Sequence, residues 1–400
     1  MLSLFTGAGG LDIGLEVAGL RSVACLELNP EARAVLKANR SDWPLPGDGD
    51  VNSAQEYLSP ETLKMARGEL DLIAGGPPCQ PFSKAAQWTS SARSGMQDDR
   101  AKCVHGMLDL VDSFLPRAIL IENVEGFLRG KDSAAEVIRK RLDEINHRNQ
   151  TSYTLEAKVV DAADYGVPQH RRRAIGIAYR DPVAVRLPEA THAEMPVRAW
   201  DALCDLEEEE KPPATGQWAG LLPSIPEGGN YLYLTARGEG AELFGWRTRY
   251  WSFLLKLAKD RASWTLPASP GPSTGPFHWE NRPLSVREQM RLQTFPDDWV
   301  IDQPFRVGRR LVGNATPPLL AEVLGRTIVQ DLELGEPKHR FDLLNAPLTL
   351  LRERQGSVPS AAPPVSVPDR YASHVGVKPA HPGEGAGPVP RHRALSGDVA

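Results

Sequence analysis

The chain has 400 residues, 41% hydrophobic and 24% charged, which excludes a small disulfide-stapled module, a wholly disordered chain and a membrane protein. Its four cysteines lack any CxxC spacing and its amino terminus lacks the features of a signal peptide, so we expect free thiols in a cytoplasmic protein. The formal net charge of −5 gives no whole-chain electrostatic reason to expect a nucleic-acid partner.

The first 180 residues alternate short apolar runs with helical patterns, which is typical of βαβ units around a parallel, doubly wound sheet. The expected strands are Leu2 to Phe5, Ser22 to Glu27, Asp71 to Ala74, Ala118 to Glu122, Leu155 to Val160 and Arg173 to Tyr179. The expected helices are Leu11 to Ala18, Pro30 to Asn39, Val104 to Phe114 and Ala134 to Asn146. An α/β domain over residues 1–181, with helices on both faces of its sheet, follows.

The remainder of the chain divides by composition. Residues 182–280 are rich in proline, glycine and aromatic side chains, which predicts a smaller, loop-rich domain. Helical periodicity returns at Ser285 to Gln293 and Pro317 to Asp331, so residues 281–340 are expected to complete the first domain. Residues 352–400 contain many prolines and glycines but a single leucine and a single tyrosine. Such a segment buries too little apolar surface to offset its ordering entropy, so we expect a disordered tail.

A glycine-rich segment, FTGAGG, joins the first expected strand to the first helix, where glycines let a ligand approach the backbone. Glu27 stands 20 residues after Gly7, at the end of the second strand, where an acid commonly binds ribose hydroxyls. Together they predict an adenosine-containing cofactor. Asp12 stands where the dinucleotide fingerprint needs glycine, which disfavours a nicotinamide or flavin oxidoreductase. The alternative is a tight turn with Glu27 as a solvated acid.

Two further strand ends carry candidate catalytic residues. In GGPPCQPFS, prolines stiffen the backbone around Cys79 at the carboxyl end of a parallel strand, so its thiol is a candidate nucleophile. The alternative for Cys79 is a small buried hydrophobe. Glu122 ends the next strand, where a half-buried carboxyl group can donate a proton to a ring nitrogen. Its alternative is a helix-capping acid.

A basic segment, QHRRR, precedes the last expected strand. Alternation along an extended chain places Arg171 and Arg173 on one face and His170 and Arg172 on the other. One face can therefore bind a phosphate or the polar edge of a base. The alternative is a solvated basic cluster.

The motifs of the chain, in the order in which they occur, resemble those of the C5-cytosine DNA methyltransferase family. They are FTGAGG, GGPPCQPFS, ENV, QHRRR, RPLSVREQMRLQTFP and VGNATP, with a long variable gap between the fourth and fifth, over roughly residues 1 to 332. The resemblance implies a Rossmann-like S-adenosylmethionine-dependent methyltransferase sheet in a catalytic and cofactor-binding domain, and a target recognition domain at residues 182–280.

The resemblance also implies a role for each matched residue. Cys79 would be the nucleophile, Glu122 the acid that contacts cytosine, and Arg171 and Arg173 the supports of the flipped base. The implied cofactor-binding residues are Phe5, Thr6, Gly7, Gly9, Gly10, Glu27, Asp50, Val51, Gly76, Pro78 and Asn314. The expected DNA-binding residues are Gln80, Ser83, Arg172, Arg237, Arg247, Arg249 and Arg282, and no metal is expected. Arg282 also matches, with Glu288, Arg291 and Gln293, the segment that organises the recognition region.

The implied function is methylation of carbon 5 of a flipped-out cytosine in a specific duplex DNA site, through a covalent Cys79 adduct at carbon 6. We expect a monomer, and a cognate restriction endonuclease acting separately. The alternatives are a tRNA methyltransferase of the same fold, whose Cys-Phe-Thr motif is missing from residues 182–280, and a catalytically silent DNA-binding relative. Because the whole chain is acidic, we expect positive charge to be confined to a local groove.

Overall fold

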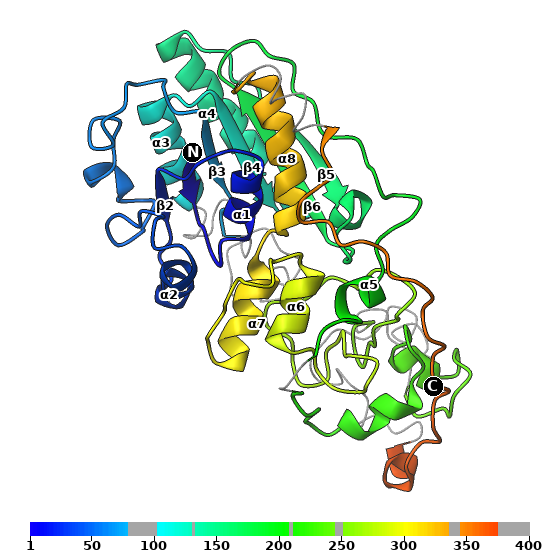
Figure 1. Cartoon of the computed structure of the whole chain (residues 1–400). Helices are drawn as coiled ribbons and strands as arrows, with labels where there is room; N and C mark the ends of the chain where they lie inside the picture. Colours follow the sequence, from blue (N-terminus) through cyan, green and yellow to red (C-terminus); the bar gives the residue numbers. More distant parts are fainter. Residues whose placement is uncertain (79–101, 130–132, 208–210, 245–250, 336–344, 375–400) are drawn as a thin grey trace, which may run out of the picture.

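The computed structural model describes residues 1–78, 102–129, 133–207, 211–244, 251–335 and 345–374. A six-stranded sheet in the order β2-β1-β3-β4-β6-β5 forms the centre of the larger lobe (Figure 1). The strands are β1 Leu2–Leu4, β2 Ala24–Leu26, β3 Leu72–Gly75, β4 Ala118–Asn123, β5 Glu156–Asp161 and β6 Arg172–Tyr179. The fold class and the six predicted strands are confirmed, with strand bounds that differ by no more than two residues.

The direction of β6 corrects the expected all-parallel sheet. Strands β2, β1, β3 and β4 are mutually parallel, whereas β6 runs antiparallel to both β4 and β5. Only residues 162–171 connect β5 to β6. A parallel crossover needs about a dozen residues or more, so this short connection favours an antiparallel neighbour. As a result, the first residues of β6 lie beside the carboxyl end of β4.

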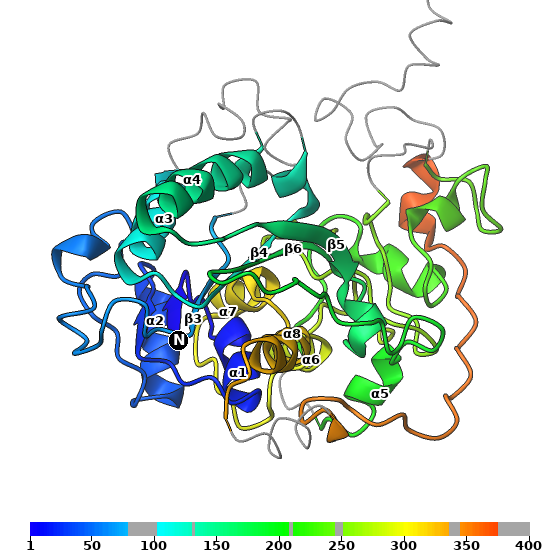
Figure 2. The same cartoon turned by 90° about the horizontal axis from the view of Figure 1, so that it is seen from above.

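Helices cover both faces of the sheet (Figure 2). One face carries α3 Lys102–Phe114 and α4 Ala134–Asn149, and the other carries α1 Gly10–Val17 and α8 Pro318–Asp331. Helix α2 Pro30–Asn39 follows β2. Gly14 brings α1 and α8 close together, because a Cβ there would lie 2.0 Å from the Pro318 carbonyl oxygen. These five helices were predicted to within three residues.

A smaller lobe lies next to the edge of the sheet at which the parallel strands end (Figure 1). Three short helices stand in or near it: α5 Ala199–Leu203, α6 Val286–Leu292 and α7 Phe305–Asn314. The sequence predicted α6 but neither α5 nor α7. The smaller lobe has an apolar core of its own, which includes Trp218, Leu221, Tyr231, Phe244 and Phe253. Between residues 211 and 284, the described part of the chain forms short 3-10 helices, isolated β-bridges and loops.

The segment that follows α8 differs from the predicted disordered tail. Residues 352–374 are described, and within them Asp369–His374 forms a 3-10 helix. Tyr371 is only 4% exposed, because it packs in the core of the smaller lobe. One aromatic side chain and several backbone hydrogen bonds therefore order a segment of unfavourable average composition. Residues 375–400, the rest of the predicted tail, lie outside the described residues.

Candidate active site

A cavity of about 680 Å³ opens at the carboxyl ends of the parallel strands. Open α/β sheets bind ligands at this edge, and a drug-sized ligand needs a cavity of about 300–1,000 Å³. Apart from Gly9, every predicted catalytic or cofactor-binding residue that the structure describes lines this cavity. They are Phe5, Thr6, Gly7, Gly10, Glu27, Asp50, Val51, Gly76, Pro78, Glu122, Arg171, Arg173 and Asn314.

Gly9 lies behind the cavity wall. Its φ of 85° is left-handed, and a Cβ there would lie 2.9 Å from the Trp299 ring. The glycine therefore turns the chain into α1 against a tryptophan instead of facing the cavity.

Glu27 is held by the backbone around it. One carboxylate oxygen accepts a 2.6 Å hydrogen bond from the Gly7 amide and the other a 2.7 Å hydrogen bond from the Asn29 amide. The residue is 8% exposed, and this burial raises the pKa of its carboxyl group. Each ionised oxygen can accept a further hydrogen bond, so the carboxylate can bind two hydroxyl groups. A solvated acid, the alternative for Glu27, does not describe this arrangement.

Glu122 and Arg173 form an ion pair inside the cavity. Arg173 Nε lies 2.9 Å from Glu122 Oε1, and the side chains are 13% and 9% exposed. Among the described residues Glu122 Oε1 accepts no hydrogen bond, so this ion pair leaves its acceptor capacity unused. Gly76 makes room for the carboxylate, since a Cβ there would lie 3.1 Å from Glu122 Oε2.

The loop that leads to Cys79 is tied to the same strand. Asn123 Nδ2 donates a 2.9 Å hydrogen bond to the Pro77 carbonyl oxygen, and Pro78 lines the cavity. Cys79 is the next residue and lies outside the described residues, as do Gln80 and Ser83. The described cysteines, Cys25, Cys103 and Cys204, are free thiols as predicted.

The predicted alternation of the basic segment is confirmed. Arg171 and Arg173 line the cavity, whereas Arg172 pairs with Glu125 at 2.9 Å and His170 with Asp161 at 3.1 Å. Arg171 is 1% exposed, which excludes a solvated cluster as its description. Its Nη2 donates to the carbonyl oxygens of Gly313 and Ala315, at 2.8 and 2.9 Å. Arg171 therefore fixes the segment around Asn314 against the start of β6.

The predicted DNA-binding residues separate into three groups. Arg237 and Arg172 are exposed, and Arg247 and Arg249 lie outside the described residues. For Arg282 the surroundings in the structure do not favour the predicted DNA contact. Its side chain is 9% exposed, and its guanidinium donates to both Glu288 oxygens, at 2.9 and 2.7 Å, and to Glu280 at 3.0 Å. These hydrogen bonds fix the start of α6, which agrees with the role in organising the recognition region that the motif also implied.

Two of the cavity residues that were not predicted from the sequence bear on what the cavity can bind. Leu28 is 61% exposed at the mouth, directly after Glu27, and offers an apolar surface to a flat ring. Arg310 lies one helical turn before Asn314 and brings a third guanidinium to the lining, 3.6 Å from Glu31. Both positions could have been found from their spacing to a predicted residue.

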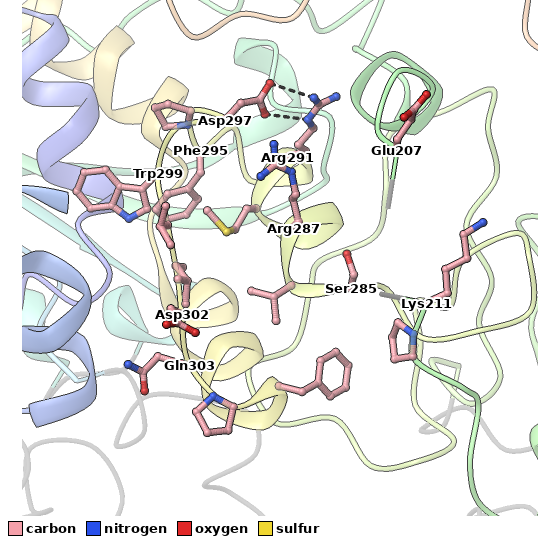
Figure 3. A pocket seen from close by; sticks show the side chains of 18 residues that line it. Glu207, Lys211, Ser285, Arg287, Arg291, Phe295, Asp297, Trp299, Asp302 and Gln303 are labelled. Carbon is pink, nitrogen blue, oxygen red and sulfur yellow. Dashed lines mark hydrogen bonds and ion pairs between the residues drawn. The ribbon is translucent and has the colours of Figure 1, made fainter. Parts of the chain in front are cut away.

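A second cavity, of about 1310 Å³, lies against α6 and the segment 295–305 (Figure 3). None of the predicted catalytic, cofactor-binding or DNA-binding residues lines it. At its edge Arg291 donates two hydrogen bonds to the Asp297 carboxylate, of 2.8 and 3.0 Å (Figure 3). Arg291 also pairs with Asp205, so this region holds a network of ion pairs.

The fold of this chain is shared with solved methyltransferases. Among solved structures, the Entamoeba histolytica methyltransferase EhMeth superimposes with a TM-score of 0.56 at 18% identity, covering 82% of this chain and 97% of that chain. A family model described as C-5 cytosine-specific DNA methylase matches residues 1–330, and the chain belongs to this family. The resemblance of its motifs to the C5-cytosine methyltransferases is thereby confirmed.

Two curated relatives cover most of the chain. It is 35% identical over 370 residues to the Type II methyltransferase M.SacI of Streptomyces achromogenes, covering 83% of this chain and 93% of the relative. It is 32% identical over 360 residues to the Type II methyltransferase M.PspPI of Psychrobacter sp., covering 86% of this chain and 81% of the relative. In the described part of the chain, no helix is long and apolar enough to cross a membrane.

S-adenosylmethionine is the methyl donor of this family, and DNA is the substrate. The cavity fits this cofactor in size and in chemistry. Glu27 offers two anchored carboxylate oxygens to a ribose, and Leu28 offers an exposed apolar side chain to an adenine. Asp50, which also lines the cavity, adds a second acidic group suited to a cationic ligand.

Proposed function

We propose that the chain is a site-specific DNA (cytosine-5-)-methyltransferase in which Cys79 is the nucleophile. The observation that carries the proposal is the Glu122–Arg173 ion pair, which lies in the same cavity as the anchored carboxylate of Glu27. One cavity thus brings groups suited to a pyrimidine ring beside groups suited to an adenosine. The proline-rich loop that leads to Cys79 starts at the same place.

The target carbon is inaccessible inside a base stack, so the cytosine must be rotated out of the duplex, at a cost of a few kcal/mol. The Cys79 thiolate then attacks carbon 6 and forms a sulfur–carbon bond, while Glu122 holds a proton at nitrogen 3. This addition makes carbon 5 nucleophilic. S-adenosylmethionine supplies, when bound, the electrophilic methyl group. A base then removes the proton from carbon 5, and the sulfur–carbon bond breaks to release the thiolate.

The arginines have supporting roles in this proposal. Arg173 keeps the Glu122 carboxyl group oriented toward the ring. Arg171 holds the segment around Asn314, which borders the cofactor part of the cavity. Arg237 in the smaller lobe, and Arg172 beside Glu125, contact DNA phosphates or base edges.

The relatives support a place in restriction and modification, since both are called Type II methyltransferases. We propose that this chain protects one short duplex site against a separately acting restriction endonuclease, and that it works as a monomer. The smaller lobe is then the target recognition domain. Its aromatic core carries the loops that read the site.

Duplex DNA containing 5-fluorocytosine tests the covalent step, because fluorine at carbon 5 cannot leave as a proton does. With S-adenosylmethionine present, the wild-type protein should form an adduct that survives denaturing electrophoresis. Cys79→Ser should form none, while Cys204→Ser, a control at a free thiol outside the cavity, should behave as wild type. An adduct that persists in Cys79→Ser would remove Cys79 from this role.

A further inference from the structure

Residues 346–374, called the C-terminal strap here, run from α8 of the larger lobe to the core of the smaller lobe (Figure 1). The strap lies beyond residues 1–330, which the family model matches. Hydrogen bonds attach it at three places along its length. Each attachment involves a different part of the protein.

The first attachment is a buried ion pair on α8. Glu322 and Arg326 are 0% and 5% exposed and lie 2.6 Å apart. Glu322 accepts hydrogen bonds from the amides of Thr349 and Leu350, at 2.8 and 3.0 Å, and Arg326 donates to the carbonyl oxygens of Ala346 and Pro347 at 2.7 and 3.0 Å. Buried charges are costly unless paired and hydrogen-bonded. The strap backbone supplies hydrogen bonds that these two charges need.

The second attachment lies where the two lobes meet. Arg352 donates a 2.9 Å hydrogen bond to Asp297, the same aspartate that binds Arg291 of α6 (Figure 3). Three residues further on, the amide of Gln355 donates a 2.8 Å hydrogen bond to Asp201 of α5. The strap therefore joins an ion-pair network that involves both α5 and α6.

The third attachment closes the core of the smaller lobe. The Val365 amide donates to the Pro223 carbonyl oxygen at 3.0 Å. Tyr371 stacks on Trp218, with ring centroids 6.0 Å apart and planes 27° apart. Its hydroxyl donates a 3.0 Å hydrogen bond to the Gln217 carbonyl oxygen. Since Tyr371 is 4% exposed among the residues that pack around Trp218, removing its ring leaves a cavity in this core.

We propose that the strap is a positioning element for DNA recognition: it completes the core of the smaller lobe and fixes that lobe against the catalytic cavity. The proposal rests on the proposed function of the smaller lobe as the target recognition domain. Because the strap reaches neither Glu27 nor Glu122, its loss should weaken DNA binding while leaving cofactor binding intact. No strap residue lines the cavity.

Three variants of the full chain test the proposal. Tyr371→Ala should raise the Kd for a cognate DNA duplex about tenfold or more, since small displacements of a positioning element cost large factors in rate and affinity. Its Kd for S-adenosylmethionine should stay within about twofold of wild type. Tyr371→Phe keeps the stacked ring and should bind DNA nearly as wild type does. Val365→Ala, at a strap side chain that is 57% exposed, is the matched control and should change neither Kd.

Amide hydrogen exchange gives a readout that needs no DNA. In Tyr371→Ala, amides around Trp218, Tyr231 and Phe253 should exchange faster, whereas those of α1 and α3 should exchange as in wild type. An unchanged DNA affinity in Tyr371→Ala would overturn the proposal, whatever the exchange shows. Equal weakening of DNA and cofactor binding would also overturn it, because the strap would then support the whole fold. If wild type binds no DNA, the proposed function fails too, and the exchange still reports separately on the packing of Tyr371.

Discussion

Arg173 Nε lies 2.9 Å from Glu122 Oε1 because the antiparallel strand β6 brings its first residues to the carboxyl end of β4. In a parallel arrangement the first residues of β6 would lie at the opposite edge of the sheet. The reversed strand thus places a guanidinium beside the carboxylate that the reaction needs. The same reversal places Arg171 against the segment around Asn314.

Replacing Glu122 tests its role in the chemical step. Glu122→Gln keeps the size of the side chain but removes its charge and the proton that it exchanges with nitrogen 3. We expect the methylation rate in a single turnover to fall about 10²- to 10⁴-fold, the usual contribution of general acid–base catalysis. Cofactor affinity should change little. Glu125→Gln removes a carboxylate that pairs with Arg172 outside the cavity and is the matched control; an equal loss in both variants would contradict the assignment.

Replacing Glu27 tests the cofactor site. Glu27→Ala removes both carboxylate acceptors and releases the amides of Gly7 and Asn29. Hydrogen bonds to a charged group contribute about 1.5–3 kcal/mol, so titration calorimetry should find S-adenosylmethionine binding about ten- to a hundredfold weaker. Glu56→Ala, at an exposed acid outside the cavity, should bind as wild type does. Unchanged affinity in Glu27→Ala would remove Glu27 from the site.

Much of this site was predictable, because the cofactor loop, Glu27, Glu122 and the arginines stand directly at strand ends. The direction of β6 was not, since an apolar run reads the same in either direction. The burial of Arg282 was also missed, because a basic residue in a DNA-binding protein suggests a phosphate contact until its acidic partners are known. The strap was missed because one buried Tyr371 outweighs an average composition that is typical of disorder.

His170 should stabilise the fold in a pH-dependent way. The hydrogen bond to Asp161 raises the pKa of His170 above its ordinary value of 6.5. The stabilisation is therefore fully present below that ordinary value and is lost as the pH rises through the folded-state pKa. Because the side chain is 43% exposed, the contribution should be about 0.2–1 kcal/mol. Urea unfolding should show His170→Gln less stable than wild type at pH 5.5 and equal to it at pH 9; a pH-independent difference would contradict the ion pair.

Arg282 should contribute to the stability of the fold through its buried ion pair with Glu288. Arg282→Ala leaves Glu288 buried without its cation, which should lower the free energy of unfolding by about 3–5 kcal/mol. Urea unfolding measures this loss. Arg282→Met fills a similar volume and, combined with Glu288→Gln, should recover part of the stability. If Arg282→Ala unfolds with the same free energy as wild type, the Arg282–Glu288 pair contributes little to the stability of the fold.

Arg237→Ala should change the free energy of unfolding by no more than about 0.5 kcal/mol, because the side chain is exposed. If Arg237 contacts a phosphate, the variant should bind DNA more weakly at low salt. The slope of log affinity against log salt should fall by about one unit. Glu239→Ala, a nearby exposed acid, is the control with the opposite charge change. The same slope in wild type and Arg237→Ala would place the phosphate contacts elsewhere.

A map of the modified cytosines shows whether the protein methylates duplex DNA through Cys79. The protein is incubated with S-adenosylmethionine and a duplex DNA library, and the modified bases are located by bisulfite sequencing, with tRNA treated in parallel. We expect methylation of carbon 5 at one cytosine of a single short, recurring duplex site, and none with Cys79→Ser. Methylation of tRNA without any methylation of DNA would contradict it.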